Sequence, residues 1–560
     1  MWSFARELGT LAIPPGRPRL SLTAGLLCTF GAGLATLLLP ELAGRITAAF
    51  PAPSITLLGA LCLALIGRCL LGFVGAYCLG MATARTVTEL RRSLFERLLH
   101  APLAFHHQRW SVDLATALTA DTAMIEQLLQ ALLPSVAQSL PLALIAALAL
   151  LATNPTLTLG LALAGLPMLA LVWMAGRALR RVAHVGQVQL GALAVAAQES
   201  LRATWLVKSL GREPFFVARV ATMAMQLLAL KRQRVFWQAT LDGVLPVGAT
   251  LALLGGALIV RGQLASGAVG VDRLAVYGGY LLILGAALFQ LVRAYTGFAQ
   301  MLGSAGRLRE LWAASVERDV RPGTVVAPGP GAISIEGLSF AYPAGHGGIF
   351  DASLAIAPGE MVGIVGPNGA GKSTLIALLL GLYPAQRGVI RLDGLAQAEA
   401  DLASWRRQFG LVTRDPVVFC LSLADNIALG RVGADQAAIE QAARSVGMHE
   451  FICGLPTGYA TNVGEGGVQL SAGQRQRIAL ARLLLQDPAV VVLDEATLSL
   501  DAEAEAAMAS VLQAWSGRRI VFIIAHQSEI AWPITRLVRL EGGRIVADHA
   551  VAAAQEHTCD

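Results

Sequence analysis

MVGIVGPNGAGKST, residues 361–374, is the stretch that decides the fold of the C-terminal half. Met361–Val365 reads as a short buried strand, and the next residues match the pattern G-x-x-x-x-G-K-[ST], with a helix expected after it. Glycines in such a loop let backbone N–H groups wrap around phosphate oxygens, and a helix N-terminus adds positive potential. This context predicts a phosphate-binding loop rather than a chance glycine-rich turn.

Two side chains of this loop have expected roles of their own. Lys372 should place its ammonium group on the β- and γ-phosphates, and Ser373 should offer its hydroxyl group to Mg²⁺. Only three of the 43 basic residues are lysines, so a lysine kept here, where a planar guanidinium would fit poorly, favours the functional interpretation. The nucleotide-binding residues predicted in the loop are Gly366, Asn368, Gly369, Gly371, Lys372, Ser373 and Thr374.

An acidic pair follows a second apolar strand, in the stretch AVVVLDE at residues 489–495. Asp494 is expected at the carboxyl edge of a parallel strand, where such sheets bind their ligands. There it can hold Mg²⁺ through water, and Glu495 can polarise the attacking water as a general base. Together with the phosphate loop upstream, the pair predicts hydrolysis of a nucleotide.

The N-terminal half has the composition of a membrane domain. Of the 560 residues, 55% are hydrophobic and only 14% are charged, whereas soluble proteins contain roughly a quarter charged residues. This composition excludes a disordered chain and disfavours an all-soluble enzyme. Six apolar runs of the length that a bilayer demands are expected to span it: 21–40, 55–79, 132–153, 156–176, 241–261 and 274–296.

The distribution of arginine predicts how these spans are oriented. Basic residues gather in segments 80–131 and 177–240, which the positive-inside rule places in the cytoplasm together with both termini. The same rule explains the net charge of +6, so no nucleic-acid partner is expected. Both segments read as amphipathic helices, and the spans should continue far into the cytoplasm, joined by turns near Ala101–Trp110 and Trp205–Pro214.

A change of composition marks the domain boundary. Residues 315–331, SVERDVRPGTVVAPGPG, are rich in proline and glycine without periodicity, which is typical of a linker. Beyond them, short β-branched strands alternate with helices, as in an α/β domain. The expected organisation is a transmembrane domain over 1–314, a linker over 315–331 and an ATP-binding domain over 332–560.

These motifs resemble those of ATP-binding cassette (ABC) transporters, specifically exporters of the half-transporter type. The family signature stands here as LSAGQ, Leu470–Gln474, with Ala472 in place of the usual glycine. The resemblance implies that Ser471, Gly473 and Gln474 face the nucleotide of an opposite subunit, so that two cassettes enclose two ATP molecules. Read by itself, LSAGQ also fits a plain helix cap. The implied fold is a six-helix membrane domain, type I exporter-like or type IV, followed by an α/β P-loop NTPase domain of the ABC type.

Other family elements are carried over by position. Tyr342 in SFAYP resembles the aromatic residue that stacks on adenine, although a strand-end tyrosine is the plain alternative. Asp501 in LSLD is similar to the aspartate that links the two sites, and His526 in FIIAHQ to the histidine that contacts the γ-phosphate. VGEGG, Val463–Gly467, resembles the exporter segment that touches the coupling helices of the membrane domain.

One position departs from the family pattern. In FGLVTRDPVVF the family has a glutamine where this chain has Arg414. That glutamine touches Mg²⁺ and the attacking water, whereas a guanidinium beside Mg²⁺ would be repelled. Arg414 is therefore expected to turn to a phosphate or to an acidic partner. We expect hydrolysis to persist, but slowed or unusually coupled to the membrane domain.

The membrane half offers one conspicuous side chain. Arg68 lies deep in the apolar run LALIGRCLLGF, where a charge costs several kcal/mol unless it faces protein or water. It is expected to face the central cavity or an internal acidic partner. A structural hydrogen bond to neighbouring carbonyl groups is the alternative.

The resemblance implies an ATP hydrolase that exports a peptide, a lipid or an amphipathic small molecule by alternating access, using ATP and Mg²⁺. The expected location is a bacterial-type cytoplasmic membrane, and the expected partners are membrane lipid, the cargo and a second half-transporter. A homodimer is favoured over a heterodimer because Lys372, Glu495, His526 and a near-complete signature occur in one chain. Two other functions fit the same residues: an exporter-fold importer of siderophore-like cargo, and a non-transporting ATP-gated channel or regulator.

Overall fold

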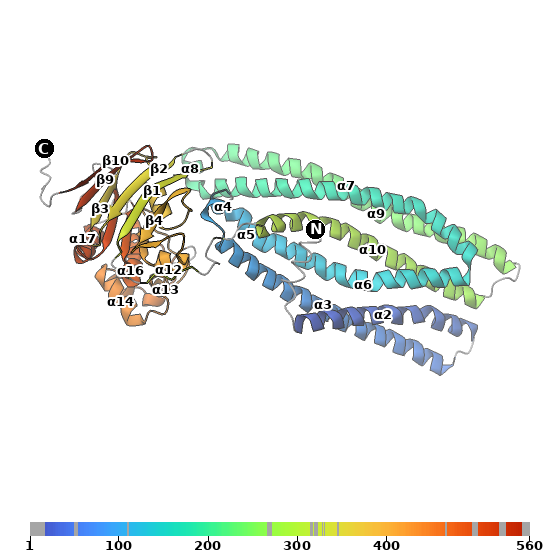
Figure 1. The fold of residues 1–560 in the computed structure, drawn as a ribbon. Coiled ribbons are helices and arrows are strands. Elements are labelled where there is room, and N and C mark those ends of the chain that lie inside the picture. The colour runs from blue at the N-terminus through green and yellow to red at the C-terminus, as the bar shows by residue number, and fades with distance from the viewer. Residues whose placement is uncertain are drawn as a thin grey trace. The chain divides into compact units, whose positions relative to one another are not determined.

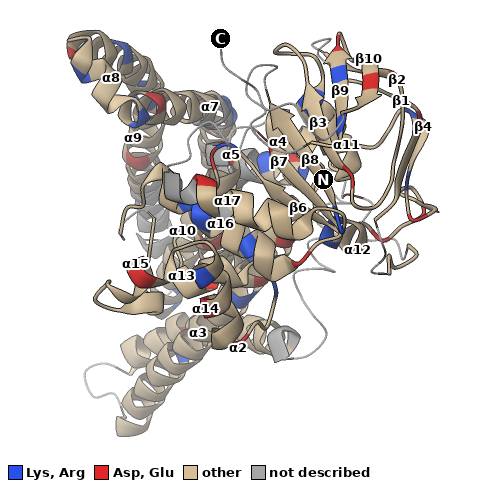
Figure 2. Ribbon diagram, turned by 90° about the vertical axis from the view of Figure 1, so that its left-hand side faces the viewer, with Lys and Arg blue, Asp and Glu red and all other residues tan. Residues whose placement is uncertain are grey.

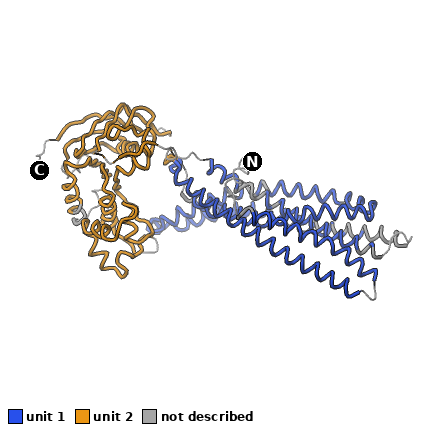
Figure 3. The backbone as a smooth tube through the Cα atoms, turned by 60° about the horizontal axis from the view of Figure 1, so that its bottom comes forward, with its two compact units in different colours: residues 1–101, 105–315 blue, residues 102–104, 316–560 orange. Residues whose placement is uncertain are grey.

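The computed structural model divides the chain into two compact units. The first comprises residues 1–101 and 105–315, and the second comprises 102–104 and 316–560 (Figure 3). The first is built of long helices, and the second contains all the strands of the described residues (Figure 1); we call them the helical unit and the α/β unit. The structure describes residues 17–49, 54–108, 111–265, 271–313, 317, 323–327, 329, 331–343, 347–464, 468–494, 502–525 and 534–551.

Six long helices build the described part of the helical unit: α2 (Arg17–Ala48), α3 (Ile55–Leu99), α6 (Thr122–Thr153), α7 (Pro155–Arg202), α9 (Glu213–Ala265) and α10 (Val271–Trp312). Each contains a stretch apolar enough to cross a membrane, and charged residues colour only a small part of the ribbon of these helices (Figure 2). Even 32 residues, the length of α2, extend about 48 Å, whereas a bilayer core is about 30 Å thick. Each predicted span falls within one of these helices, which continue beyond most of the spans.

Short elements lie between the long helices: α4 (Leu103–Gln108), α5 (Ser111–Thr116), the π-helix η1 (Ala117–Asp121) and α8 (Thr204–Ser209). The tightest junction joins α6 to α7 at Asn154. The Asn154 side chain accepts a hydrogen bond from the Leu157 N–H at 3.2 Å, and Pro155 is the first residue of α7. An N-cap followed by proline ends one helix and starts the next because proline has no N–H to donate to the preceding turn.

Helices α2 and α3 approach each other closely. A Cβ on Gly75 of α3 would lie 2.7 Å from the Thr29 methyl carbon of α2, so glycine is needed for the two backbones to pack. Farther along α2, Pro40 interrupts the helical hydrogen bonding. The Tyr280 hydroxyl of α10 donates to the carbonyl oxygen of Leu37 at 3.3 Å and so satisfies one of the carbonyl groups near this interruption.

The α/β unit contains two sheets. The first has the strand order β2-β1-β4-β5 with antiparallel pairs, and the second has the order β10-β9-β3-β8-β7-β6, in which β9, β3, β8, β7 and β6 are parallel. The strands are β1 (Ile333–Ala341), β2 (Gly348–Ile356), β3 (Met361–Val365), β4 (Arg387–Leu392), β5 (Leu395–Ala396), β6 (Phe409–Val412), β7 (Val490–Asp494), β8 (Ile520–Ala525), β9 (Arg536–Glu541) and β10 (Arg544–Ala550).

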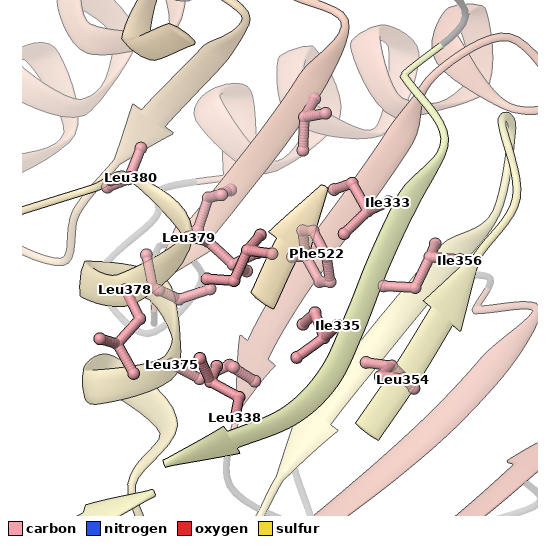
Figure 4. Packing of buried hydrophobic residues seen from close by; sticks show 14 of the residues in the cluster. Ile333, Ile335, Leu338, Leu354, Ile356, Leu375, Leu378, Leu379, Leu380 and Phe522 are labelled. Carbon is pink, nitrogen blue, oxygen red and sulfur yellow. The ribbon is translucent and has the colours of Figure 1, made fainter. Parts of the chain in front are cut away.

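Two hydrophobic cores lie on opposite faces of the parallel strands. In β7, Val490 and Val492 belong to one core and Val491 and Leu493 to the other, as expected for a strand buried on both faces. In the first core, side chains of α11 and of β1 and β2 point toward Phe522 (Figure 4). The helices of this unit are α11 (Lys372–Leu379), α12 (Leu402–Arg407), α13 (Leu423–Ala428), α14 (Gln436–Ser445), α15 (His449–Cys453), the 3₁₀-helix η3 (Gly458–Ala460), α16 (Ala472–Gln486) and α17 (Ala502–Trp515).

Candidate functional site

Parallel strands of the second sheet bring the predicted motifs to one edge. Val365, the last residue of β3, pairs with Ala525 at the end of β8, and Asp494 of β7 pairs with Ile524 one residue earlier. Strand β6, next to β7, ends at Val412. Since the carboxyl ends of parallel strands share one edge, the phosphate loop, the acidic pair and the Arg414 segment start from the same side of the sheet.

The phosphate loop requires glycine at its two ends. Gly366 has φ +156°, and a Cβ there would lie 2.1 Å from the Leu540 carbonyl oxygen. Gly371 has φ +102°, and its Cβ would lie 2.8 Å from the Gly348 carbonyl oxygen. Gly369 also has a positive φ, +80°, but no atom lies within 4 Å of its would-be Cβ. Glycine therefore lets the backbone form a tight cradle that suits phosphate.

The predicted side chains of the loop lie around this cradle. Lys372 is the first residue of α11 and is buried, and its ammonium group donates to the carbonyl oxygens of Gly366 at 2.6 Å and Pro367 at 3.3 Å. The ammonium group of Lys372 therefore lies over the loop. Ser373 and Asn368 are exposed, whereas Thr374 is buried. Basic and hydroxyl groups at a helix N-terminus fit the triphosphate of ATP.

Tyr342 lies beside the loop, just after β1. Its ring meets Phe340 edge-on, with centroids 5.0 Å apart, and Tyr383 at 5.4 Å. Its hydroxyl group hydrogen bonds with that of Thr374 at 3.3 Å. Burial raises the pKa of Tyr383, and Tyr342 adds to that effect. In this aromatic cluster Phe340 and Tyr383 are buried and Tyr342 is half-buried, so the Tyr342 ring next to the phosphate loop is suited to hold a nucleobase.

The acidic end of β7 supplies oxygen ligands. Asp494 is the last residue of β7 and is half-buried at the same sheet edge as the phosphate loop. Carboxylate and hydroxyl oxygens, here Asp494 and Ser373, are the ligands that Mg²⁺ prefers, so the donor set fits this ion. Glu495, Asp501 and His526 lie outside the described residues.

The signature begins helix α16 with a complete capping box. The Ser471 hydroxyl accepts from the Gln474 N–H at 3.2 Å, and the Gln474 side-chain oxygen accepts from the Ser471 N–H at 2.9 Å. Ser471 is exposed and Gly473 is buried. The cap interpretation of LSAGQ is thus correct as local structure, and it leaves an exposed helix N-terminus that is suited to bind an anion.

Arg414 is exposed, two residues beyond the end of β6.

Arg482 of α16 was not predicted from the sequence. Its side chain holds the segment that follows Arg414 in place. The Arg482 guanidinium donates to the carbonyl oxygens of Val417 at 2.6 Å and Asn426 at 2.7 Å, and to the Asn426 side-chain oxygen at 2.6 Å. Burial lowers the pKa of Arg482. The sequence could have indicated this residue: Arg482 follows Ile478 by four residues, so it places a cation on the apolar face of α16.

In the membrane-spanning part, Arg68 takes a partner that neither expectation named. Its Nε donates to the Thr36 hydroxyl oxygen of α2 at 3.0 Å. No carboxylate of the described residues forms an ion pair with Arg68. The predicted internal acid is therefore not found in the described part, and a hydroxyl group on the neighbouring helix accepts the hydrogen bond instead of a backbone carbonyl.

Of the segment Val463–Gly467, which was predicted to touch the membrane domain, the structure describes only Val463 and Gly464.

A phosphate loop, an acid suited to hold Mg²⁺ and a capped signature helix on one sheet-based unit, joined to six apolar helices, define a membrane-bound P-loop ATPase. The sequence matches the family "ABC transporter" over residues 349–498 and the family "ABC transporter transmembrane region" over 22–288. The chain therefore belongs to the ABC transporters, with a transmembrane region followed by a C-terminal ATP-hydrolysing cassette.

Individual relatives agree with this assignment along most of the chain. The ATP-dependent lipid A-core flippase of Saccharophagus degradans is 30% identical over 480 residues, which cover 85% of this chain and 80% of the flippase. The mitochondrial ATP-binding cassette sub-family B member 10 of Mus musculus is 31% identical over 553 residues, covering 95% and 76%. A solved structure of a bacterial Atm1-family ABC exporter with ATP bound has a TM-score of 0.84 at 26% identity and covers 95% of both chains. The chain thus has the exporter fold of a half-transporter.

Proposed function

We propose that the chain is one half of a homodimer that couples ATP hydrolysis to the export of an amphipathic cargo across the cytoplasmic membrane of a bacterium. A peptide, a lipid or an amphipathic small molecule fits this description, and the similarity to a lipid A-core flippase supports the lipid. The observation that carries the proposal is that one chain holds both a phosphate loop and a capped signature helix. The phosphate loop leads into α11, which packs in the first hydrophobic core. The exposed signature cap begins α16, which packs in the second core.

Each residue of the site has a distinct part in hydrolysis. The loop N–H groups and Lys372 bind the phosphates and offset their charge, and Tyr342 supports adenine. Ser373 and Asp494 would hold Mg²⁺, which when bound neutralises charge that develops on the phosphates. Glu495 orients and deprotonates the attacking water, and His526 contacts the γ-phosphate. Ser471, Gly473, Gln474 and Asp501 complete the site from the opposite subunit.

An exposed apolar hairpin in the helical unit supports the proposal that a second copy of the chain binds. The tip formed by the end of α7, α8 and the start of α9 carries large apolar side chains that are at least 60% exposed: Leu201, Trp205, Leu210 and Phe215. Leu201 lies 25 residues after the predicted span 156–176, and Phe215 lies 26 residues before the predicted span 241–261, so we place this tip outside the lipid. Contiguous apolar surface in water marks an interaction site. A partner chain is the cover that we propose.

The arginine-rich segments support the orientation. Segments 80–131 and 177–240 contain most of the basic residues of the helical unit, so the positive-inside rule places them and the α/β unit in the cytoplasm. ATP is present there. When ATP joins two cassettes, the helices are expected to favour an outward-open form, and hydrolysis resets them.

Mixing two inactive variants tests the shared site. Lys372→Ala disables the phosphate loop and Ser471→Ala disables the signature, so each homodimer should lose ATPase activity. A purified mixed dimer that holds one copy of each variant contains one intact site, and its ATPase activity should exceed that of either parent at least tenfold. Activity that stays at the parental level in the mixed dimer would contradict sites shared between two copies.

Direction of transport is measured in oriented vesicles. ATP-dependent accumulation of labelled lipid or peptide inside inverted membrane vesicles is the result expected for an exporter. Uptake into right-side-out vesicles would indicate an importer instead. ATP-dependent ion current without cargo movement would indicate a channel or a regulator.

A further inference from the structure

The side-chain amide of Gln386 binds both backbone polar groups of one residue, Ala341. Its oxygen accepts from the Ala341 N–H at 3.1 Å, and its nitrogen donates to the Ala341 carbonyl oxygen at 2.9 Å. A residue in an antiparallel sheet exchanges the same two hydrogen bonds with its partner on the next strand. Backbone pairing between β1 and β4 reaches only Ser339 on β1, so Gln386 continues this edge with its side chain.

The backbone of Gln386 is itself fixed to β1. Its N–H donates to the Ser339 carbonyl oxygen at 3.0 Å, and the next residue, Arg387, begins β4 and pairs with Ser339. Ser339 and Ala341 are two residues apart, so in an extended strand both present their backbone groups to the same edge. Gln386 therefore holds Ala341 from an anchored position.

The backbone that Gln386 holds carries Tyr342. The Ala341 carbonyl belongs to the peptide bond before Tyr342, and this bond is planar, so fixing its oxygen fixes the direction in which Tyr342 leaves the strand. Pro343 restricts Tyr342 from the other side, because a residue before proline disfavours the helical region. The hydrogen bonds of Tyr342 itself are longer: 3.3 Å between its hydroxyl and that of Thr374, and 3.5 Å from its N–H to the carbonyl oxygen of residue 347.

We propose that Gln386 is a positioning residue for the nucleobase: its amide holds the peptide bond before Tyr342 and thereby sets where the ring lies. This inference rests on the adenine contact proposed above for Tyr342. A base stacks on an aromatic ring only when the ring has the right place and tilt, so a ring that is ordered before binding loses less conformational entropy when the base arrives. Gln386 acts on the base through Tyr342 and not on the phosphates.

Removing the amide should leave the fold intact. Gln386 is exposed and Ala341 is half-buried, so water can bind the Ala341 polar groups when the amide is absent. The thermal unfolding midpoint of Gln386→Ala without nucleotide should stay within about 3 °C of that of the wild type. A larger fall, combined with weaker binding of every phosphate ligand, would show a merely structural role and overturn the inference.

ATPase kinetics of the full-length chain in lipid nanodiscs separate the base from the phosphates. The KM for ATP is compared with the inhibition constant of inorganic tripolyphosphate, a competing ligand that has no base. Gln386→Ala should raise the KM about fivefold and leave kcat and the inhibition constant unchanged, because only the contact with the base weakens. An unchanged KM, or an inhibition constant that rises as much as the KM, would overturn the inference.

Two further variants show which property of the side chain matters. Gln386→Glu keeps the length and the acceptor but lacks the donor, and its carboxylate would face the Ala341 carbonyl oxygen. It should therefore raise the KM at least as much as Gln386→Ala. Gln436→Ala is the matched control: it removes an exposed amide that bonds to Glu440 within α14, and the KM should not change. A wild-type KM in Gln386→Glu, or an equal rise in Gln436→Ala, would contradict the assigned role.

A double variant tests whether Gln386 acts through Tyr342. Tyr342→Ala alone should raise the KM about tenfold or more, and adding Gln386→Ala should raise it no further, because the ring to be positioned is gone. Effects that multiply in the double variant would overturn the inference.

The inference and the proposed function can fail separately. If Tyr342→Ala raises the KM but Gln386→Ala does not, the positioning role is wrong and the adenine contact stands. If Tyr342→Ala leaves the KM unchanged, the adenine contact is wrong and the positioning role falls with it. If mixed dimers of Lys372→Ala and Ser471→Ala stay inactive while Gln386→Ala and Tyr342→Ala behave as expected, the shared ATP site is wrong and the positioning role stands.

Discussion

Replacing Gly371 by alanine tests whether ATP binding depends on the backbone of the phosphate loop. Its φ of +102° costs an alanine about 1–2 kcal/mol. The added Cβ would also lie 2.8 Å from both the Gly348 carbonyl oxygen and the Ile349 Cδ1. Gly348 is the first residue of β2 and pairs with Ala341 of β1, so this oxygen is not free to retreat. Such overpacking costs about 1–3 kcal/mol more, so the two costs together reach about 2–5 kcal/mol, and we expect ATP affinity to fall by about 30-fold or more.

Gly369→Ala is the matched control. Gly369 also has a positive φ, +80°, but its Cβ would meet nothing within 4 Å. Gly369→Ala therefore bears the conformational cost of about 1–2 kcal/mol alone, and its loss of affinity should be about 5- to 30-fold. Titration of a fluorescent ATP analogue against the full-length chain in nanodiscs measures both variants. Equal affinities for the two variants, or unchanged affinity in Gly371→Ala, would refute the reasoning from the cradle.

Three further changes test other parts of the account. Arg414→Gln restores the family residue and should raise the ATPase rate and its stimulation by cargo; an unchanged rate and unchanged stimulation would show that this position has no special role. Asp548→Asn should lower the free energy of unfolding by about 1–2 kcal/mol at pH 7, because Asp548 accepts two hydrogen bonds of 2.7 Å from Arg536, which lower its pKa. This stabilisation is present above the ordinary carboxyl pKa of about 3.9 and is lost as pH falls through the lowered value, so the variant should differ from the wild type at pH 7 but converge with it in acid. Glu317→Gln breaks the two-point contact of Glu317 with Arg406, 3.0 Å at each point, and should speed limited proteolysis of segment 315–331 severalfold; an unchanged cleavage rate would show that the contact does not hold this segment.

Local motifs could be predicted from sequence because their chemistry lies within a few residues. The phosphate loop needs only a strand, glycines and Lys372, and the structure places them in that order. The capping box of α16 could likewise be derived from the spacing of Ser471 and Gln474. The six apolar helices follow from run length alone, since a bilayer sets that length.

Contacts between distant segments could not be derived in this way. Arg68 was conspicuous in the sequence, but its partner Thr36 depends on the rotation of α2 against α3, which Gly75 and other small residues set. Arg482 reads as one more arginine of a helix, and only the fold brings Val417 to it. A cavity of about 470 Å³ in the helical unit is lined by residues of α5, η1, α7, α9 and α10, and no pattern along the chain indicates it. Such sites depend on tertiary packing rather than on local pattern.

The central claim is that ATP hydrolysis at the cassette drives cargo through the helices, and Glu495→Gln tests it most directly. ATP hydrolysis and cargo accumulation are measured in the same inverted vesicles, with ATP binding measured on the purified protein. We predict that the variant still binds ATP, that hydrolysis falls about 100-fold or more, and that cargo accumulation falls in the same proportion. Hydrolysis at the native rate, or cargo accumulation that persists without it, would contradict the account.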